Sequence, residues 1–325
     1  MSAVRHVPFC LAVLTLFLSA CGGSSSGGGT PCEFSNGCIN RHALMNTNAD
    51  TLSTYNLFVD PTDPTAQPRE NGLRYELTTS LFSDYSSKYR FIFVPPGEQV
   101  VWDDQEAFEF PVGTVITKTF SMPADTAFTG PEHETLLETR LLIRRASGWV
   151  ALPYVWNAER TDATLRITGA TIPVELVHNG AQRNFTYRVP DRNQCATCHA
   201  KTTNSVPAIS LIGPKARFLN REITLEGETV SQLQHWVESG LLAGAPPVLS
   251  EVDTVPAYEN ADAMLIDGMT DAALLRNAKG YLDINCAHCH RPEGGASTSG
   301  LFLEFWRDFA TSPERHGVCK RPIAY

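Results

Sequence analysis

The sequence predicts an α+β protein of more than one domain, in which an N-terminal antiparallel, sandwich-like β domain precedes a mainly α-helical region. Up to about residue 190, short strand-like runs alternate with turn residues, whereas the later sequence has helical spacing and long loops. The chain has 325 residues, of which 42% are hydrophobic, so it can bury a core, and its length fits about two domains. We therefore expect a β-rich domain over 51–190 and a helical region over 191–325.

The first twenty residues have the pattern of an export signal. Arg5 gives a positive start, and residues 7–18 are apolar apart from Thr15. This run is too short to span a bilayer as a stable helix. We expect residues 1–20 to be a signal peptide that is removed.

A lipid attachment site follows the apolar run. The sequence Leu18-Ser19-Ala20-Cys21 resembles the bacterial lipobox, in which cleavage leaves the cysteine to carry the lipid. An ordinary signal peptide with a chance cysteine is the alternative. A Gly- and Ser-rich stretch comes next, so we expect residues 21–50 to form a lipidated, flexible linker. Because no Asp follows the cysteine, the pattern favours the outer membrane of a Gram-negative bacterium, facing the periplasm.

The net charge limits which classes of partner the protein is expected to bind. At −9, the chain lacks the basic surplus that nucleic acid binding needs, so we expect no nucleic acid partner. Any electrostatic steering favours a basic partner instead.

The first half contains runs rich in Val, Ile, Thr and aromatic residues, which favour strands. Turn signals such as Pro95-Pro96-Gly97 and Asn179-Gly180 separate them. We expect strands at 89–94, 113–122, 139–145, 149–156, 164–167 and 185–189.

Two helices are expected in the second half. The first has an apolar face and Gly240 as its stop. The second begins at Thr270, which can cap it, and Asp271 favours its positive end. The apolar face of the first consists of Val230, Leu233, Trp236 and Val237, and the apolar stripe of the second of Leu274, Leu275, Ala278, Tyr281 and Leu282.

Nine cysteines divide into groups with different chemistry. Cys32 and Cys38 are close enough for a local disulfide in an oxidising compartment, which we favour over a metal site. Four others form two Cys-x-x-Cys-His motifs, which are Cys195-Ala196-Thr197-Cys198-His199 and Cys286-Ala287-His288-Cys289-His290.

Each motif matches the attachment sequence for c-type haem. Two thiols three residues apart can reach both vinyl groups of one porphyrin, and the adjacent imidazole can then bind the iron. We therefore expect two covalently bound haem c groups. Their binding residues would be Cys195, Cys198, His199, Cys286, Cys289 and His290, with His199 and His290 as iron ligands.

Two other readings of the motifs compete with haem. One is a zinc site built from both cysteine pairs, and the other is a thioredoxin-like redox pair. Zinc does not explain a histidine after each pair, and no βαβ pattern surrounds either motif. We favour haem.

The sixth iron ligands are less defined. Met264 and Met269 lie downstream of the first motif and either can bind the first iron, with His235 as a rival. His316 is the imidazole downstream of the second motif, so the second iron uses it, borrows an upstream ligand or stays open. We do not expect His288 to be a ligand.

These residues resemble a family of bacterial lipoprotein di-haem c-type cytochromes with an N-terminal β domain. The resemblance covers most of the chain from about residue 70, and it implies haem attachment at both motifs and a cytochrome c-like helical region. Family members usually continue into a helical tail that can supply a Met, so an early end of this chain is a further explanation for the undefined ligand of the second iron. The matching pieces are Leu81-Phe82-Ser83-Asp84-Tyr85 with Lys88 and Arg90, Tyr154-Val155-Trp156-Asn157, Thr161-Asp162-Ala163, Asn193-Gln194-Cys195, Gly213-Pro214-Lys215, Tyr281-Leu282 and Asn285-Cys286.

We expect an exported electron carrier rather than a catalyst, which passes electrons between redox partner proteins. One alternative is a peroxidase-like enzyme at an iron with an open site. Another makes the β domain a binding module for a protein or saccharide, through Trp102, Trp149, Tyr154 and Trp156.

Overall fold

The structure is a computed structural model that describes residues 37–79, 81–225, 227–255 and 269–321. The expected signal peptide and the residues Cys21, Cys32 and Met264 lie outside the described residues. Cys38 is disulfide-bonded. Since its expected partner is Cys32, the pairing stays a prediction. None of the described helices has the length and hydropathy needed to cross a membrane.

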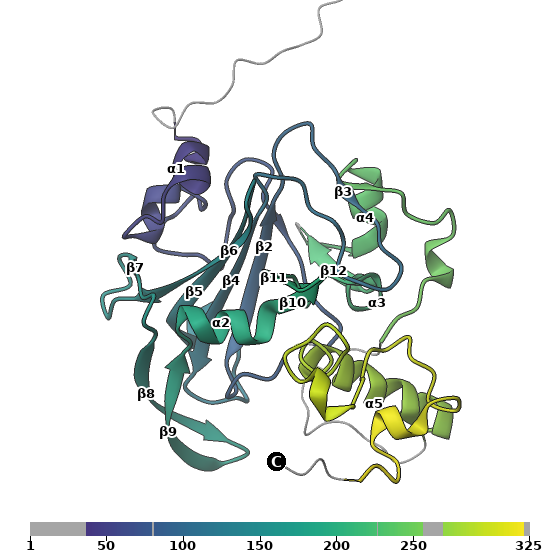
Figure 1. The fold of residues 1–325 in the computed structure, drawn as a ribbon. Helices are drawn as coiled ribbons and strands as arrows, with labels where there is room; N and C mark the ends of the chain where they lie inside the picture. The colour runs from purple at the N-terminus through teal and green to yellow at the C-terminus, as the bar shows by residue number, and fades with distance from the viewer. Residues whose placement is uncertain (1–36, 80, 226, 256–268, 322–325) are drawn as a thin grey trace, which may run out of the picture. The chain divides into compact units, whose positions relative to one another are not determined.

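A six-stranded antiparallel sheet forms the centre of the fold (Figure 1). Its strand order is β1-β2-β4-β5-β6-β7, and each strand pairs with its neighbour in antiparallel register. The expected strands are confirmed, five of them in this sheet and the sixth in β9 (Ala181–Val189). The strands of the sheet are β1 (Leu73–Arg74), β2 (Ser87–Phe93), β4 (Val115–Pro123), β5 (Glu134–Arg145), β6 (Gly148–Trp156) and β7 (Ala163–Leu165).

Four two-stranded ribbons surround the sheet. Three are antiparallel hairpins, while β3 and β14 pair in parallel across a long separation in sequence. The remaining strands are β3 (Val100–Val101), β8 (Ala170–His178), β10 (Ala200–Thr203), β11 (Val206–Ile209), β12 (Glu222–Leu225), β13 (Glu228–Ser231) and β14 (Leu242–Ala243).

The described α-helices are short apart from the last. They are α1 (Arg41–Asn46), α2 (Arg192–His199), α3 (Ala216–Leu219), α4 (Gln232–Glu238) and α5 (Asp271–Asn285). Single turns of 3₁₀ helix occur at η2 (Leu52–Tyr55), η3 (Pro131–His133), η4 (Leu249–Glu251), η6 (Ser297–Ser299) and η7 (Pro313–His316).

The predicted fold class is wrong. In the described part of the chain 32% of residues are in strands and 21% in helices, so no mainly α-helical, cytochrome c-like region follows the β domain. Residues 200–209 and 222–231 each fold into a hairpin, where helix or loop was expected. Their β-branched residues flank Asn204-Ser205 and Gly227, whose positive φ angles close the turns. The described part also lacks a second large sheet stacked on the first, as a sandwich requires.

The two faces of the sheet pack against different partners. One face packs against α1 and η2, and its core includes Tyr55, Tyr154 and Trp156. The other face packs at one end on residues from Leu211 onward, including Trp236, and at the other end on β8 and β9. The hydrophobic core therefore continues past residue 190, the expected domain boundary.

Helix α5 is confirmed, with Thr270 as its N-cap, but the predicted apolar stripe is not its buried side. The stripe residues Leu274, Leu275 and Tyr281 are 38%, 40% and 48% exposed. The buried side consists of Asn277, Gly280, Asp283 and Ile284.

An ion pair cluster explains this orientation. The Asp283 carboxylate is fully buried and accepts hydrogen bonds from Lys215 Nζ at 3.0 Å and Arg217 Nη2 at 2.6 Å. Burial opposes the charge on Asp283, but Lys215 and Arg217 outweigh burial and hold its pKa below the usual value. The cluster therefore ties α5, which carries the second motif, to the segment around α3.

We expect Asp283→Asn to lower the free energy of unfolding by about 3–5 kcal/mol, because it leaves two buried cations without their carboxylate. Chemical denaturation at pH 7 measures the change. The matched control is Asp253→Asn, which breaks the exposed ion pair with Arg276 and should cost less than about 1 kcal/mol. Equal losses in both variants would contradict the assignment.

The ion pairs of Asp283 predict that the stability of the fold depends on pH. Because the folded pKa of Asp283 is depressed, its stabilising effect is complete above about pH 4, the pKa of an unfolded Asp. It is lost as the pH falls through the folded pKa.

Candidate functional site

The first motif lies on α2, which crosses one face of the sheet (Figure 1). Asp191 caps the helix, and Gln194 completes a reciprocal capping box with it. Cys195 is 8% exposed and points toward the sheet, whereas Cys198 is exposed. The two thiols therefore lie three residues apart on one short, well-capped helix, as attachment to one porphyrin requires.

His199 is held in a defined orientation at the end of α2. Its Nδ1 lies 2.8 Å from the backbone oxygen of Ser210, and since a carbonyl can only accept, Nδ1 carries the proton. Burial lowers the pKa of His199 to about 4, so the ring is neutral at pH 7. The Nε2 lone pair is therefore available to bind a metal, with the second-shell partner that metal-binding histidines usually have.

The second motif forms a compact turn directly after α5. The His290 backbone N–H donates to the Cys286 oxygen at 2.9 Å, which continues the helical path to the end of the motif. The backbone at Gly294 lies very close to the backbone of Cys289. A Cβ at position 294 would lie only 2.2 Å from the Cys289 backbone oxygen, so the turn requires glycine there. His290 Nδ1 lies 3.0 Å from Ser299 Oγ, so this imidazole is also held through Nδ1.

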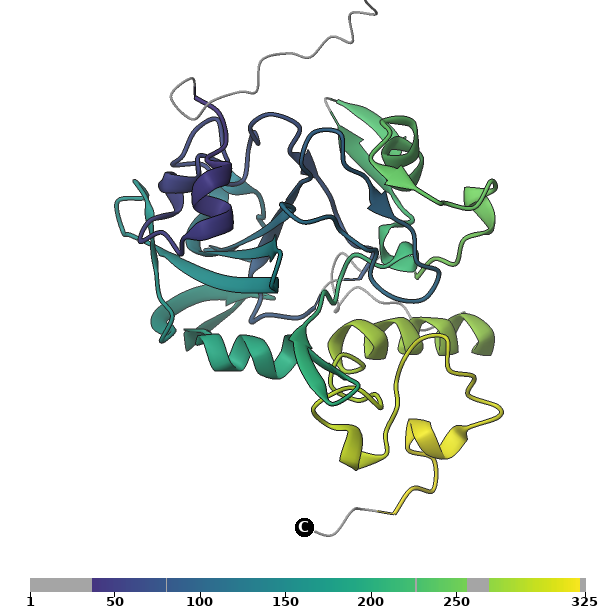
Figure 2. The same cartoon turned by 45° about the horizontal axis from the view of Figure 1, so that its top comes forward.

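The two motifs lie against each other. Cys289 Sγ is 3.8 Å from the Thr197 backbone oxygen, and the Cys198 thiol is near enough to raise the pKa of Cys289. Just beyond the motifs, the Thr202 N–H donates to the Glu293 oxygen at 2.8 Å. Figure 2 shows the segment after α2 beside the loops that follow α5. Residues 91 positions apart in the chain are thus brought into contact.

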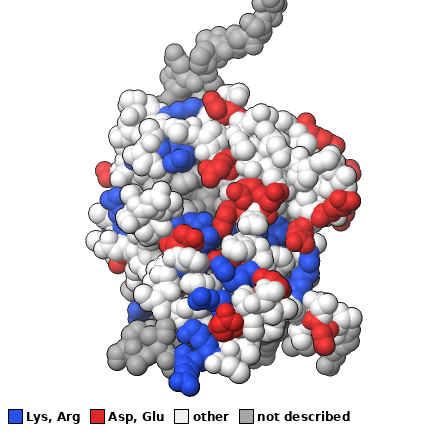
Figure 3. Space-filling view, turned by 45° about the vertical axis from the view of Figure 1, so that its right-hand side comes forward, with Lys and Arg blue, Asp and Glu red and all other residues white. Residues whose placement is uncertain are grey.

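Glu106 binds both motif segments to a loop next to β3. Its carboxylate accepts from Lys201 Nζ at 2.9 Å and from Arg291 Nη2 at 2.7 Å. Figure 3 shows acidic and basic side chains interspersed over one face of the molecule. Ion pairs between exposed side chains of this kind add little stability. Arg291 is 8% exposed on its side chain, so its pair with Glu106 is better shielded. Burial opposes the Glu106 charge, but the bonds from Arg291 and Lys201 lower its pKa to about 2.

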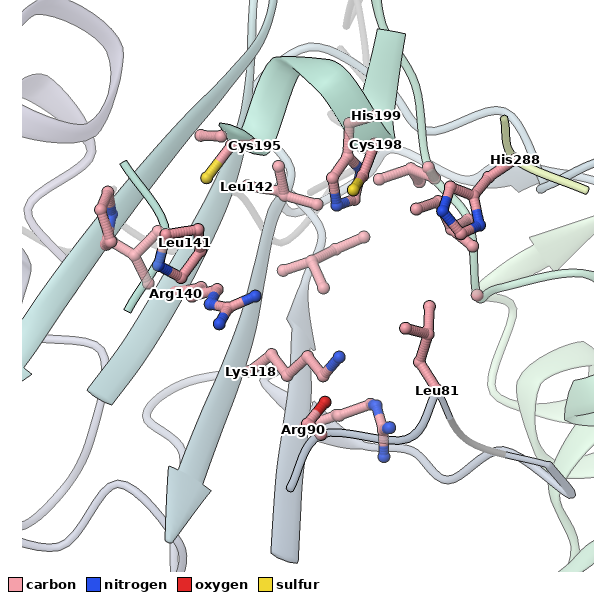
Figure 4. Close-up of a pocket in the computed structure, with 18 of the residues that line it drawn as sticks. Leu81, Arg90, Lys118, Arg140, Leu141, Leu142, Cys195, Cys198, His199 and His288 are labelled. Atoms are coloured by element: carbon pink, nitrogen blue, oxygen red, sulfur yellow. The ribbon is translucent and has the colours of Figure 1, made fainter. Parts of the chain in front are cut away.

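A cavity of about 380 Å³ opens beneath the first motif (Figure 4). This volume lies in the range of roughly 300–1,000 Å³ that is typical of ligand pockets. Cys195, Cys198 and His199 line one side, and cationic and apolar side chains of the sheet line the other. Many residues that carry the family resemblance also line it, namely Leu81, Phe82, Ser83, Asp84, Arg90, Gln194, Gly213 and Pro214.

The pKa values of three of the motif thiols do not favour a thioredoxin-like redox pair. Burial raises the pKa of Cys195, Cys286 and Cys289, whereas a redox-active thiol has a lowered pKa. Across the described ranges, no group of three or more His, Cys, Asp or Glu side chains is arranged to hold a metal ion. The residues at the first motif therefore fit a haem, with two thiols, a neutral imidazole and a cavity.

Among the described residues, the expected sixth ligands Met269 and His235 do not lie at the cavity of the first motif. Met269 Sδ lies 3.3 Å from Asn277 Nδ2 on α5, and neither Met269 nor His235 lines the cavity. Met264 is outside the described residues. The ligand role of these residues stays a prediction.

Two histidines have buried ring nitrogens that lack a hydrogen-bond partner among the described residues. His316 donates through Nδ1 to the Ser312 oxygen at 3.1 Å, and its Nε2 has no partner. This is the arrangement of a potential iron ligand, and His316 is the candidate for the second haem. His288, which we did not expect to be a ligand, lines the cavity of the first motif and has an unpartnered Nδ1.

The aromatic residues proposed for a binding surface do not form one. Tyr154 and Trp156 are buried in the core, where Trp156 Nε1 donates to Thr139 Oγ1 at 3.0 Å. Trp102 and Trp149 pack against the other core. Their side chains therefore support the fold.

Sequence reasoning missed Glu106 and the cations of the cavity. No local motif marks Glu106, because its partners Lys201 and Arg291 lie far along the chain. The cations Arg90, Lys118 and Arg140 could have been noticed in the sequence, because each is a charged residue within a strand-like run.

No protein-family model, curated protein or solved structure matches the chain. The resemblance to di-haem lipoproteins therefore stays a prediction, and the function has to be inferred from the geometry of the two motifs.

We expect a short thiol-specific cross-linker to join Cys198 and Cys289 in protein made without haem attachment, because these two thiols are neighbours. The test uses the variant Cys195→Ser/Cys286→Ser/Cys319→Ser, which removes the other described free thiols. Peptide mass spectrometry identifies the linked pair. Absence of the Cys198–Cys289 link would show that the motifs are not adjacent.

Adding Glu106→Gln to this variant should lower the yield of the link, since it weakens the hold on both segments. The matched control is Glu76→Gln, because Glu76 also pairs with two arginines, Arg74 and Arg221. This control should leave the yield unchanged.

Proposed function

We propose that the chain is a di-haem c-type cytochrome that transfers electrons. One observation carries the proposal: two Cys-x-x-Cys-His motifs lie in contact, each with its histidine anchored through Nδ1. A single motif would support haem binding only. Two adjacent motifs favour a relay, because electron transfer between bound groups becomes faster as their separation falls.

The residues have distinct roles in this proposal. Cys195 and Cys198 would hold one haem, and Cys286 and Cys289 the other. His199 and His290 would bind the irons through Nε2, since Nδ1 of each is engaged with Ser210 or Ser299. Bound haem supplies reversible one-electron chemistry at iron.

The protein would contribute rigidity and exclusion of water. The capping box fixes α2, the Asp283 cluster fixes α5, and Glu106 ties the segments after both motifs together. Such preorganisation keeps the attachment points at a constant separation, so an electron can pass without rearrangement of the chain. The apolar side chains Leu142 and Leu211 line the first cavity and limit its hydration.

The proposal includes the location and partners that the sequence predicts. An export signal followed by a lipidated Cys21 would place the protein at the outer membrane, on the periplasmic side, where c-type haem is attached. Redox proteins would be its donor and acceptor. The support for this part is the N-terminal sequence alone.

We expect protein co-expressed with cytochrome c maturation factors to carry two haems, counted by the mass of the intact chain. Reduced and oxidised spectra should show that both irons cycle reversibly. Cys195→Ala/Cys198→Ala and Cys286→Ala/Cys289→Ala should each retain one haem. A matured chain with no added mass and no Soret absorption would rule the proposal out.

The same spectra test the enzymatic alternative. Low-spin iron in both haems is expected of an electron carrier. A high-spin haem that binds cyanide quickly and turns over peroxide would instead indicate a peroxidase-like enzyme.

A further inference from the structure

Three cations stand in a row across the sheet. The strand register places Arg90 on β2 opposite Lys118 on β4, and Lys118 opposite Arg140 on β5. Like charges directly opposite each other destabilise a sheet. All three side chains line the cavity under the first motif, and Figure 4 shows them on the sheet side of it. A row of this kind requires a compensating anion.

The protein supplies only part of that compensation. Arg140 donates twice to Glu138, at 2.8 and 2.6 Å, and Glu138 is fully buried. Among the described residues, neither Arg90 nor Lys118 has a hydrogen-bonded carboxylate, although Arg90 is 7% exposed. Glu138 thus serves Arg140, and Arg90 and Lys118 face the cavity without a carboxylate partner.

Burial makes these charges costly without a partner. It lowers the pKa of Lys118 well below the usual value, and the nearby cations Arg90, Lys88 and Arg140 lower it further. Burial also lowers the pKa of Arg90. At the cavity rim, Asp84 and Arg188 are exposed and add one charge of each sign. The rim therefore adds no net charge to the cavity.

The position of the row matches the shape of a haem. The thioether bonds of haem c lie on one side of the porphyrin, and its two propionates lie toward the opposite side. In Figure 4, Cys195 and Cys198 come from α2 on one side of the cavity, and Arg90 and Lys118 come from the sheet on the other. A porphyrin attached at α2 would thus direct its carboxylates toward the sheet.

We propose that Arg90 and Lys118 bind the two propionates of the haem attached at the first motif, while Glu138 holds Arg140. This inference rests on the proposed function, because it assigns a site for part of the same cofactor. Two propionates would supply the carboxylates that Arg90 and Lys118 lack. Arg90 can donate two hydrogen bonds to one carboxylate, and Lys118 lies directly opposite it on β4.

The test uses matured protein and the variants Lys118→Met and Arg90→Gln. A cation near the haem favours reduced iron, which carries one positive charge less than oxidised iron. Removing it should therefore lower the midpoint potential of one haem. We expect about a tenfold change in the ratio of reduced to oxidised iron at fixed potential, which is about 59 mV for one electron.

Arg144→Gln is the matched control. Arg144 lies on β5, four residues from Arg140 and on the same face, but it does not line the cavity and is not among the charges that act on Lys118. We expect its replacement to change neither potential by more than about twofold in that ratio, or about 18 mV. Lys118→Arg, which keeps the charge, should restore the wild-type potential.

The outcomes separate this inference from the proposed function. If both haems are attached and Lys118→Met and Arg90→Gln shift neither potential beyond the Arg144→Gln control, the propionate site is wrong and the function stands. If the wild-type chain takes up no haem, both are wrong. Loss of one attached haem in Lys118→Met with retention in Lys118→Arg would support the site.

Discussion

The contact between the two motif segments is the constraint on which the site depends. Cys289 lies against the backbone of Thr197, and Thr202 hydrogen bonds to Glu293, so each segment limits where the other can lie. Glu106 adds an ion pair to each segment from a third part of the chain. Because the two segments are far apart in sequence, their association carries a loop-closure cost that these contacts have to offset.

The sheet face beneath α2 carries both apolar side chains that pack in the core and cationic side chains that are costly to bury. At its ends it buries apolar side chains, such as Ile92 and Phe120, against the surrounding elements. Between them it presents Arg90, Lys118 and Arg140, which weaken strand pairing and are expensive to bury. Such a row persists in a marginally stable protein only where something else offsets its cost. The location of the row under a cysteine-bearing helix is the reason for proposing that a ligand offsets this cost.

Elements with local signals were predictable from the sequence. Five of the six strands of the large sheet were found because β-branched runs and turn residues mark them, and α5 was found because Thr270 and the helical spacing define its start. The residue types of the two motifs were equally clear. Helix α2 was missed, although Asp191 and Gln194 form a capping box at its start. Its eight residues are too few for a periodic pattern.

The remaining features depend on partners that a local pattern does not show. Periodicity assigns the apolar stripe of α5 to the core, yet the helix turns Asp283 inward because Lys215 and Arg217 are already buried beside it. Exposing Leu274 and Leu275 costs less than leaving two buried cations without a carboxylate. The orientation of the helix that carries the second motif is therefore set by charge pairing. For the same reason, the cations beneath α2 become interpretable only when the strand register places them side by side.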